Sequence, residues 1–369
     1  MSKMYHSDTI IKYFKHLLYN PNMPKESMRE QFKKILYETN IRNYDSDVIN
    51  NEKINNLSKT LTDIKPQKLY RYRTYNKNSL NALKNNLITF TKPSSFNDPF
   101  DSLVYINPDN VFQNIMNHSA RQDLAKWLNI NPNIKNVIPD EMYKNLIALI
   151  EEPIENYQLT VKLAQPKFKM LIMLIIRSAL VFLKNYPHIA CFSETQYSPT
   201  MWAHYADSHQ GYVLEYDQSI ECHSCSQCKN KCRNAHYDLL LPVIYSNERY
   251  DANNFVIEYI SQNLFANNPN VFVPNNDRLS MHKILIHKSK DWEYEREWRM
   301  ISLCNTIPKV IQKPTGIYLG INMPEENKRV LYDLAKANDI KVYQMYIEPN
   351  TLEYKINSYE IFERNLNGL

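Results

Sequence analysis

The sequence predicts an α+β fold, in which a mostly antiparallel β-sheet carries helical insertions. Short alternating segments rich in aromatic residues, such as 68–75 (KLYRYRTY) and 212–217 (YVLEYD), are typical of strands. Apolar residues spaced by three and four, as in 10–18 (IIKYFKHLL), predict helices. Helices come first, then two strands, then more helices, and finally strands with short helices between them. That order favours an antiparallel sheet into which helical segments are inserted.

Two regions are expected along the 369 residues, which are enough to bury a sizeable core. Residues 1–65 are predicted to form an N-terminal helical extension, in which no residue suggests chemistry. The pattern changes at Lys65-Pro66, and residues 66–369 are predicted to form the main domain. This domain is expected to carry a helical insertion at about 105–186 and a cysteine-rich insertion at about 220–237.

The elements of the main domain follow from local patterns and turn residues. The expected strands are 68–75, 87–93, 189–193, 212–217, 239–246, 315–323 and 340–349. Short helices are expected at 78–87, capped by Asn78 or Ser79, and at 324–339. Another is expected at 198–211, capped by Ser198 and stopped by Gly211.

Composition excludes several kinds of site. With only four glycines, the chain has neither a glycine-rich phosphate loop nor a dinucleotide-binding GxGxxG motif. The net charge of +5 is too small to predict nucleic-acid binding by itself. The N-terminus lacks a signal core, and the apolar run from Met170 is broken by Arg177 and too short to span a bilayer. We therefore expect a cytoplasmic protein without a membrane partner.

The stretch 287–301 (HKSKDWEYEREWRMI) has the most unusual pattern. As a strand it would place Glu293, Glu295 and Glu297 on one face, with Tyr294 and Trp298 on the other. Three carboxylates on one strand face repel one another and gain nothing as structure. A cationic ligand or a developing positive charge would make the arrangement useful. The alternative is an exposed edge strand whose charges discourage pairing.

Two other strands are expected to carry polar groups. Arg71 and Arg73 share one face of the strand 68–75, where a guanidinium can hold a phosphate through two hydrogen bonds. Ser193 ends an apolar strand, where its hydroxyl can orient a ligand or a carboxylate. The alternatives are solvent-facing arginines and a simple strand-end hydroxyl.

A cysteine-rich segment predicts a metal site. Cys222, Cys225, Cys228 and Cys232 stand within eleven residues. In a cytosolic chain such spacing indicates zinc before disulfides, and four thiolates satisfy a closed, structural site. The intervening basic residues leave a nucleic-acid contact as a second interpretation.

Four blocks of the sequence form a recognisable series: LYRYR (69–73), ITFTKPSSFNDPFD (88–101), CFSETQYSPTMWAHYADSHQGYVLEYD (191–217) and DWEYEREWRMI (291–301). Together they resemble the DUF2971 family of bacterial proteins. The resemblance covers roughly residues 66–305. The N-terminal helices and the cysteine insertion lie outside these blocks.

The order of the blocks also resembles the ADP-ribosyltransferase fold of the Arg–Ser–Glu type, which has a split antiparallel sheet. This resemblance implies an enzyme that uses NAD as substrate. Arg71, with Arg73 as the alternative, would contact the ribose or phosphates of NAD, and Ser193 would position the nicotinamide side and the catalytic carboxylate. Glu297 would stabilise the ribosyl cation, and Glu295 would orient or deprotonate the acceptor.

The sequence departs from that pattern at Ser193-Glu194-Thr195, where the transferase pattern has Ser-Thr-Ser. The implied reaction breaks the nicotinamide–ribose bond and passes ADP-ribose to an unidentified protein, nucleic acid or water, as a toxin or defence effector would. The alternative function is a non-catalytic, zinc-stabilised module that binds nucleic acid or protein.

One helix is expected to present an aromatic face. Trp202, Tyr205 and His209, at spacings of three and four, would share this face in the helix 198–211. They could stack on nicotinamide or adenine, and the alternative is that they belong to the core.

Overall fold

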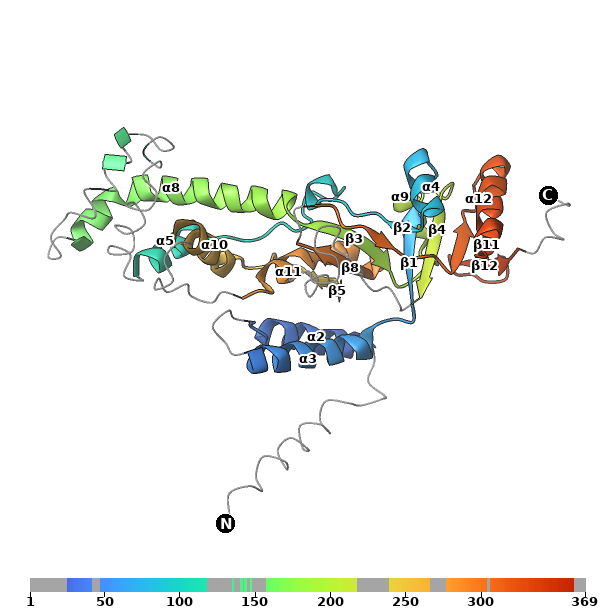
Figure 1. Cartoon of the computed structure of the whole chain (residues 1–369), viewed down its shortest axis with the longest axis horizontal. Helices are drawn as coiled ribbons and strands as arrows, with labels where there is room; N and C mark the ends of the chain where they lie inside the picture. Colours follow the sequence, from blue (N-terminus) through green and yellow to red (C-terminus); the bar gives the residue numbers. More distant parts are fainter. Residues whose placement is uncertain are drawn as a thin grey trace, which may run out of the picture. The chain divides into compact units, whose positions relative to one another are not determined.

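The computed structural model describes residues 25–41, 47–117, 157–217, 239–265, 277–303 and 306–361, with six single residues between 135 and 147. The chain forms two compact units (Figure 1). Helices α2 (Lys25–Glu38) and α3 (Asp47–Ile64) belong to the first unit, and the residues from Pro66 onward belong to the second. Phe32, Leu36 and Leu57 are buried in the first unit.

The second unit contains an eight-stranded sheet in the order β12-β11-β10-β4-β1-β3-β8-β5. Its strands are β1 (Lys68–Arg73), β3 (His188–Ser193), β4 (Tyr212–Asp217), β5 (Leu239–Pro242), β8 (Glu297–Ser302), β10 (Gly316–Leu319), β11 (Lys341–Ile347) and β12 (Ile356–Glu360). Neighbouring strands are antiparallel except β10 and β11. The expected α+β fold with a mostly antiparallel sheet is therefore confirmed.

Two small sheets accompany the large one. They pair β2 (Leu87–Ile88) with β9 (Val310–Ile311), and β6 (Ile244–Ser246) with β7 (His287–Ser289). The helical elements of this unit are α4 (Lys77–Lys84), η1 (Pro93–Ser95), α5 (Pro108–Asn117), α8 (Tyr157–Asn185), α9 (Pro199–Tyr205), α10 (Asn253–Phe265), α11 (Ser280–Leu285), η6 (Lys290–Glu295) and α12 (Glu325–Ala337).

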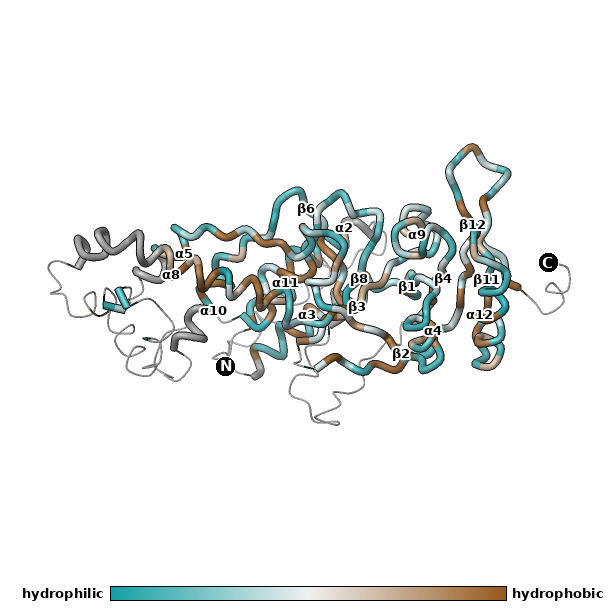
Figure 2. The backbone as a smooth tube through the Cα atoms, turned by 90° about the horizontal axis from the view of Figure 1, so that it is seen from above, coloured by the Kyte–Doolittle hydropathy of each residue, from teal (hydrophilic) through white to brown (hydrophobic). Residues whose placement is uncertain are grey.

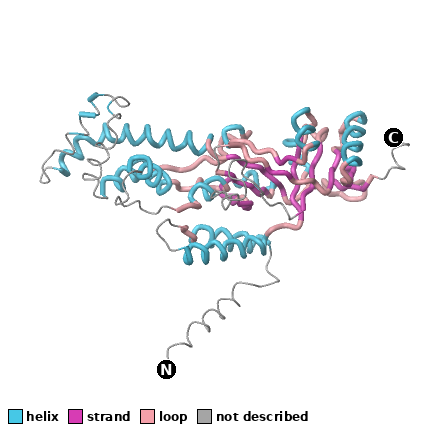
Figure 3. Tube along the Cα trace, viewed as in Figure 1, coloured by secondary structure: helices cyan, strands magenta, loops and turns pink. Residues whose placement is uncertain are grey.

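Helices α5, α8 and α10 pack together beside the strands (Figure 3). One buried apolar cluster joins them and contains Val111 of α5, Ile176 and Leu183 of α8, and Val256 of α10. Ile176 and Leu183 are seven residues apart, which places both on the same face of α8. Hydrophobic stretches of backbone mark this cluster (Figure 2). None of the helices in the described residues is long and apolar enough to cross a bilayer.

Backbone pairing in the large sheet is sparsest between β1 and β3. Strand β1 pairs with β4 at six successive positions, and β3 pairs with β8 at six, but β1 and β3 meet only at Tyr70 opposite Ser193. Away from that one pair, β1 and β3 are not paired with each other, and Ile189 of β3 pairs with Thr91 instead. Side chains of both strands therefore line a pocket at the junction.

The structure corrects the expectation for residues 287–301. Residues Lys290–Glu295 form a 3₁₀ turn, Arg296 adopts a left-handed conformation (φ 45°), and the strand begins only at Glu297. Glu293, Glu295 and Glu297 therefore do not share a strand face. The turn leaves Glu293 in solvent and buries Glu295, which removes one of the three repelling carboxylates from the face.

Several boundaries also differ from the expectation. Helix α9 begins after Ser198, whose hydroxyl accepts the Met201 N–H as predicted, but ends at Tyr205 because residues 207–209 take positive φ values. Helix α4 is capped by Asn76, through a capping box with Ser79. Residues 239–246 form two short strands in different sheets, and strand β12 was not expected.

Candidate functional site

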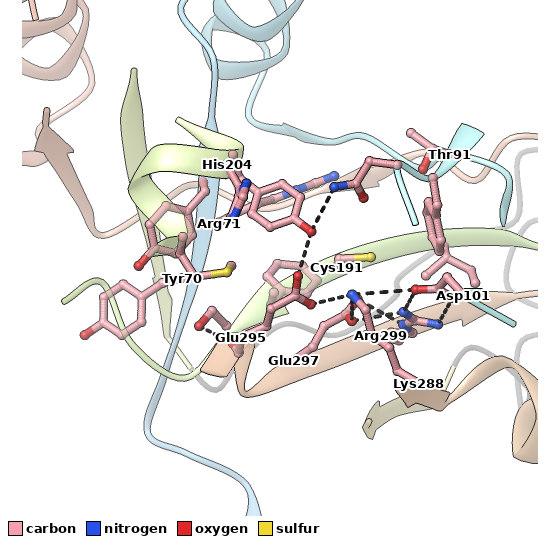
Figure 4. A pocket seen from close by; sticks show the side chains of 18 of the residues that line it. Tyr70, Arg71, Thr91, Asp101, Cys191, His204, Lys288, Glu295, Glu297 and Arg299 are labelled. Carbon is pink, nitrogen blue, oxygen red and sulfur yellow. Dashed lines mark hydrogen bonds and ion pairs between the residues drawn. The ribbon is translucent and has the colours of Figure 1, made fainter. Parts of the chain in front are cut away.

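A pocket of about 340 Å³ lies at the junction of β1, β3 and β8. This volume is within the range typical of ligand pockets, roughly 300–1,000 Å³. Strands β1 and β3 form its floor, with walls from α9, η6 and the loop after η1 (Figure 4). Its polar lining residues are Tyr70, Arg71, Tyr72, Arg73, Thr91, Ser95, Asn97, Asp101, Cys191, Ser193, His204, Tyr205, Lys288, Glu295, Glu297 and Arg299.

Six of the eight non-cysteine site residues predicted from sequence line this one pocket. They are Arg71, Arg73, Ser193, Tyr205, Glu295 and Glu297. Trp202 and His209 do not line it: the Trp202 ring is fully buried, donates its N–H to the Gln196 carbonyl at 2.7 Å, and stacks on His209. The expected shared face of Trp202, Tyr205 and His209 is wrong, because α9 ends before His209.

Ser193 holds the turn that carries the two glutamates. Its hydroxyl donates to the carbonyl oxygen of Glu295 at 2.7 Å, and in the β3–β8 ladder it stands opposite Glu297. Between the two glutamates, Arg296 adopts the left-handed conformation and ends the 3₁₀ turn. The two carboxylates therefore come from successive elements, a 3₁₀ turn and a strand, and still face the same space.

The carboxylates belong to a buried cluster of charges (Figure 4). Lys288 places its ammonium 2.5 Å from Glu295 Oε2 and 3.3 Å from Glu297 Oε2. Arg299 donates to both oxygens of Glu297 at 2.9 Å and binds both oxygens of Asp101. All five side chains are nearly inaccessible to solvent. Such a cluster is stable only because each charge has partners of opposite sign.

The cluster pushes the pKa values of its two glutamates apart. Burial and the neighbouring Glu297 raise the pKa of Glu295 to about 7. Burial alone would raise the pKa of Glu297 as well, but Arg299 and Lys288 outweigh it and lower this pKa to about 2. Glu297 is therefore an anion at neutral pH, while Glu295 can exchange a proton. A pair of this kind can divide the roles of charge stabiliser and acid or base.

The other end of the pocket is cationic. Arg71 is buried and donates through Nη2 to the hydroxyl of Thr89 at 3.1 Å and to its carbonyl. Its guanidinium also lies 5.6 Å from the Phe192 ring centroid. Burial and the neighbouring Arg73 lower the pKa of Arg71 to about 10. No carboxylate within the described ranges pairs with Arg71 or Arg73, so this end favours an anion.

An aromatic wall joins the pocket to the surface. The Tyr205 hydroxyl donates to Glu295 Oε1 at 2.6 Å, and burial followed by the Glu295 charge raises the pKa of Tyr205. Beside Tyr205, the ring centroid of His204 lies 6.1 Å from the ring centroid of Trp292 and 6.4 Å from that of Tyr294. Trp292 stands on the 3₁₀ turn, where the ammonium nitrogen of Lys288 lies 4.9 Å from its ring centroid.

Sequence reasoning missed Asp101, Lys288 and Arg299. Two of them could have been found: Arg299 follows Glu297 by two residues, so both share a face of β8, and Asp101 ends the FNDPFD block. Lys288 carries no such signal, because only the pairing of β6 with β7 brings it to the cluster. Cys191 also lines the pocket, beside Glu297, and burial raises the pKa of its thiol.

Metal ligands cannot be placed at the predicted zinc site, since Cys222, Cys225, Cys228 and Cys232 lie outside the described residues. In the part of the chain that is described, no three His, Cys, Asp or Glu side chains come together as a metal site would require. The zinc site stays a prediction from the cysteine spacing.

The family model that matches this chain covers residues 201–300 and is described as a protein of unknown function, DUF2971. Residues 201–300 are thus similar to that family. The family resemblance expected from the sequence is confirmed over this range. The matched segment runs from α9 to β8, so it contributes Tyr205, Lys288, Glu295, Glu297 and Arg299 to the pocket. No protein of the curated set and no solved structure matches the chain.

Proposed function

We propose that this chain binds NAD in the pocket and breaks the bond between nicotinamide and ribose. The observation that supports this proposal is the meeting of Arg71, Ser193 and the Glu295–Glu297 pair in one pocket. These residues come from three neighbouring strands and the turn before the third, in the order that the ADP-ribosyltransferase resemblance implies. The single backbone pairing between β1 and β3 also supports a split sheet of that type.

The charges of the pocket suit the two ends of such a substrate. The guanidinium groups of Arg71 and Arg73, which have no carboxylate partner in the described part of the chain, would hold the phosphates, because arginine binds phosphate through two parallel hydrogen bonds. At the opposite end, the Glu297 carboxylate would stabilise the positive charge that develops on the ribose ring. Ser193 would act on the turn rather than on the substrate, since its hydroxyl proton is used by the Glu295 carbonyl.

The chemical step is the loss of neutral nicotinamide. The C1′–N bond breaks, its electron pair stays on the nicotinamide nitrogen, and the ribose becomes an oxocarbenium ion that is attacked by an acceptor. Glu295, with a pKa raised to about 7, would take the proton that the acceptor loses as the new bond to C1′ forms. The acceptor is a protein, a nucleic acid or water, so the enzyme is an ADP-ribosyltransferase or an NAD glycohydrolase.

The direct test is release of nicotinamide from NAD by the purified chain, measured with and without protein and nucleic-acid acceptors. Glu297→Gln should lower the rate by about a hundredfold or more, because removing one preorganised charge from a transition state costs on the order of 3 kcal/mol. Glu293→Gln is the matched control, since Glu293 lies on the same turn but is exposed, and it should keep the wild-type rate. No release with any acceptor, or equal rates in the two variants, would contradict the proposal.

A further inference from the structure

Lys288 is the residue on which the two glutamates converge. It lies in the middle of β7, and its buried side chain is 4% exposed. One ammonium contacts Glu295 at 2.5 Å, Glu297 at 3.3 Å and Asp101 at 3.6 Å. Removing a lysine ammonium from water is costly, and only its contacts with the carboxylates can offset that cost.

We propose that Lys288 is a positioning residue of this pocket, whose ammonium holds Glu295 and Glu297 at one cation and allows Glu295 to lose its proton, while Arg299 keeps Glu297 an anion. This inference rests on the proposed function in one respect only, namely the reaction in which the proton of Glu295 would be used. The placement of the proton follows from contacts within the chain.

Counting charges explains the effect of the ammonium. Among the described residues, the three carboxylates of the cluster, Asp101, Glu295 and Glu297, pair with two buried cations, Lys288 and Arg299. A third, half-buried cation, Lys184, donates to the backbone carbonyl of Asp101 at the edge of the cluster. One proton on a carboxylate makes the five buried side chains neutral by themselves, which a low-dielectric site favours. Burial lowers the pKa of Lys288, but the charges of Glu297 and Glu295 outweigh this and raise it, so the ammonium stays charged.

The position of the proton is decided by which carboxylate has fewer cationic contacts. Asp101 and Glu297 each accept two hydrogen bonds from Arg299, and Glu297 also contacts Lys288. Glu295 has Lys288 as its only cation in the described part of the chain, and its other oxygen accepts from the neutral Tyr205 hydroxyl. Glu295 is therefore the carboxylate of this cluster that gains and loses a proton near neutral pH.

The groups that face this pair come from four elements. Tyr205 of α9 faces Glu295, and Cys191 of β3 faces Glu297. Tyr294 stands beside Glu295 on η6, and Asp101 comes from the loop after η1. The pKa values of Tyr205, Tyr294 and Cys191 are all raised, so these three groups are neutral at neutral pH.

The test is the titration of Glu295, followed by carbon NMR of labelled glutamate carboxyl groups and assigned with Glu295→Gln. Lys288→Met removes the ammonium and should raise the midpoint of Glu295 by about 1–3 pH units, because a partner of opposite charge has been lost. Lys288→Arg keeps the charge and should leave the midpoint within about half a unit of the wild type. If Lys288→Met does not fold, Lys288→Gln, which is neutral but can still donate hydrogen bonds, should show the same rise.

Lys283→Met is the matched control for the loss of a buried ion pair, because Lys283 is as buried as Lys288 and contacts Asp277 at 2.7 Å outside the pocket. It should weaken folding without moving the titration of Glu295. An unchanged midpoint in the neutral Lys288 variants, or an equal rise in Lys283→Met, overturns the proposal. If nicotinamide is released, the acid limb of the rate profile should move with the midpoint. If it is not released, the titration still decides the role of Lys288.

Discussion

Arg299 and Asp101 form a two-point ion pair across 198 residues of sequence. Nη1 of Arg299 lies 2.9 Å from Oδ1 of Asp101, and Nη2 lies 2.5 Å from Oδ2. The guanidinium is fully buried and also lies 5.3 Å from the ring centroid of Phe96. This pair joins the loop after η1 to strand β8, and so it joins two walls of the pocket.

Removing this guanidinium should be strongly destabilising. Arg299→Met leaves Asp101 and Glu297 buried without their principal partner, and should lower the free energy of unfolding by about 3–5 kcal/mol. The control is Lys341→Met, which removes the more exposed pair of Lys341 with Glu360 at the sheet surface and should cost less than about 1 kcal/mol. Urea denaturation followed by circular dichroism measures both. Similar losses in the two variants would mean that the buried pair contributes little.

Arg71 should determine the affinity for a phosphate-bearing ligand. If NAD is that ligand, Arg71→Lys should weaken its binding by about 10–100-fold, because a lysine cannot reproduce a two-point hydrogen bond to phosphate. Isothermal calorimetry on the Glu297→Gln background would measure binding without turnover. Arg73, which is half-buried on the same strand face, is the comparison: an equal or larger loss in Arg73→Lys would assign the phosphate contact to Arg73 instead.

Stability should fall as the pH rises toward neutrality. Burial raises the pKa of Glu258 in α10 to about 7, above its ordinary value of 4.5, while Ser280 donates to it at 2.9 Å. The folded state therefore binds more protons than the unfolded state between those pH values. The contribution of Glu258 is fully present below about pH 4.5 and is lost as the pH rises through about 7.

Replacing Glu258 should flatten this dependence. Glu258→Gln should remove a fall on the order of 2–3 kcal/mol between pH 5 and 8. Glu295 contributes in the same direction over the same window, so a smaller slope should remain. Unfolding in urea at several pH values measures the slope, and the exposed Glu353→Gln should leave it unchanged. A slope that is the same in Glu258→Gln and in the wild type would contradict the prediction.

The cysteine-rich segment should hold a single zinc ion per chain. Four thiolates at Cys222, Cys225, Cys228 and Cys232 satisfy tetrahedral zinc, so metal analysis of the purified protein should find zinc in equimolar amount. Cys225→Ser should lower the zinc content, whereas Cys191→Ser, in the pocket, should not. A strong chelator should release the metal without affecting Glu295, because the pocket is built from other residues.

Much of the fold could be predicted because its signals are local. Strands β1, β3 and β4 and the start of α9 follow from short alternating runs and from the Ser198-Pro199 pair, which act over a few residues. Residues 290–295 could not be assigned in this way, because their 3₁₀ turn depends on partners far away in sequence. Glu295 is drawn inward by Lys288 and Tyr205, while Glu293 stays outside.

The sequence by itself determined the α+β class, because the alternation of a strand and the spacing of a helix can be recognised within a short stretch of residues. In the same way, residue type alone identified the candidates Arg71, Ser193, Glu295 and Glu297. Only the tertiary structure decided that these side chains share one pocket. It also decided that Lys288 and Arg299 divide three carboxylates between them. The physical reason is that the charge state of a buried group depends on its neighbours in space, and strand pairing brings those neighbours from distant parts of the chain.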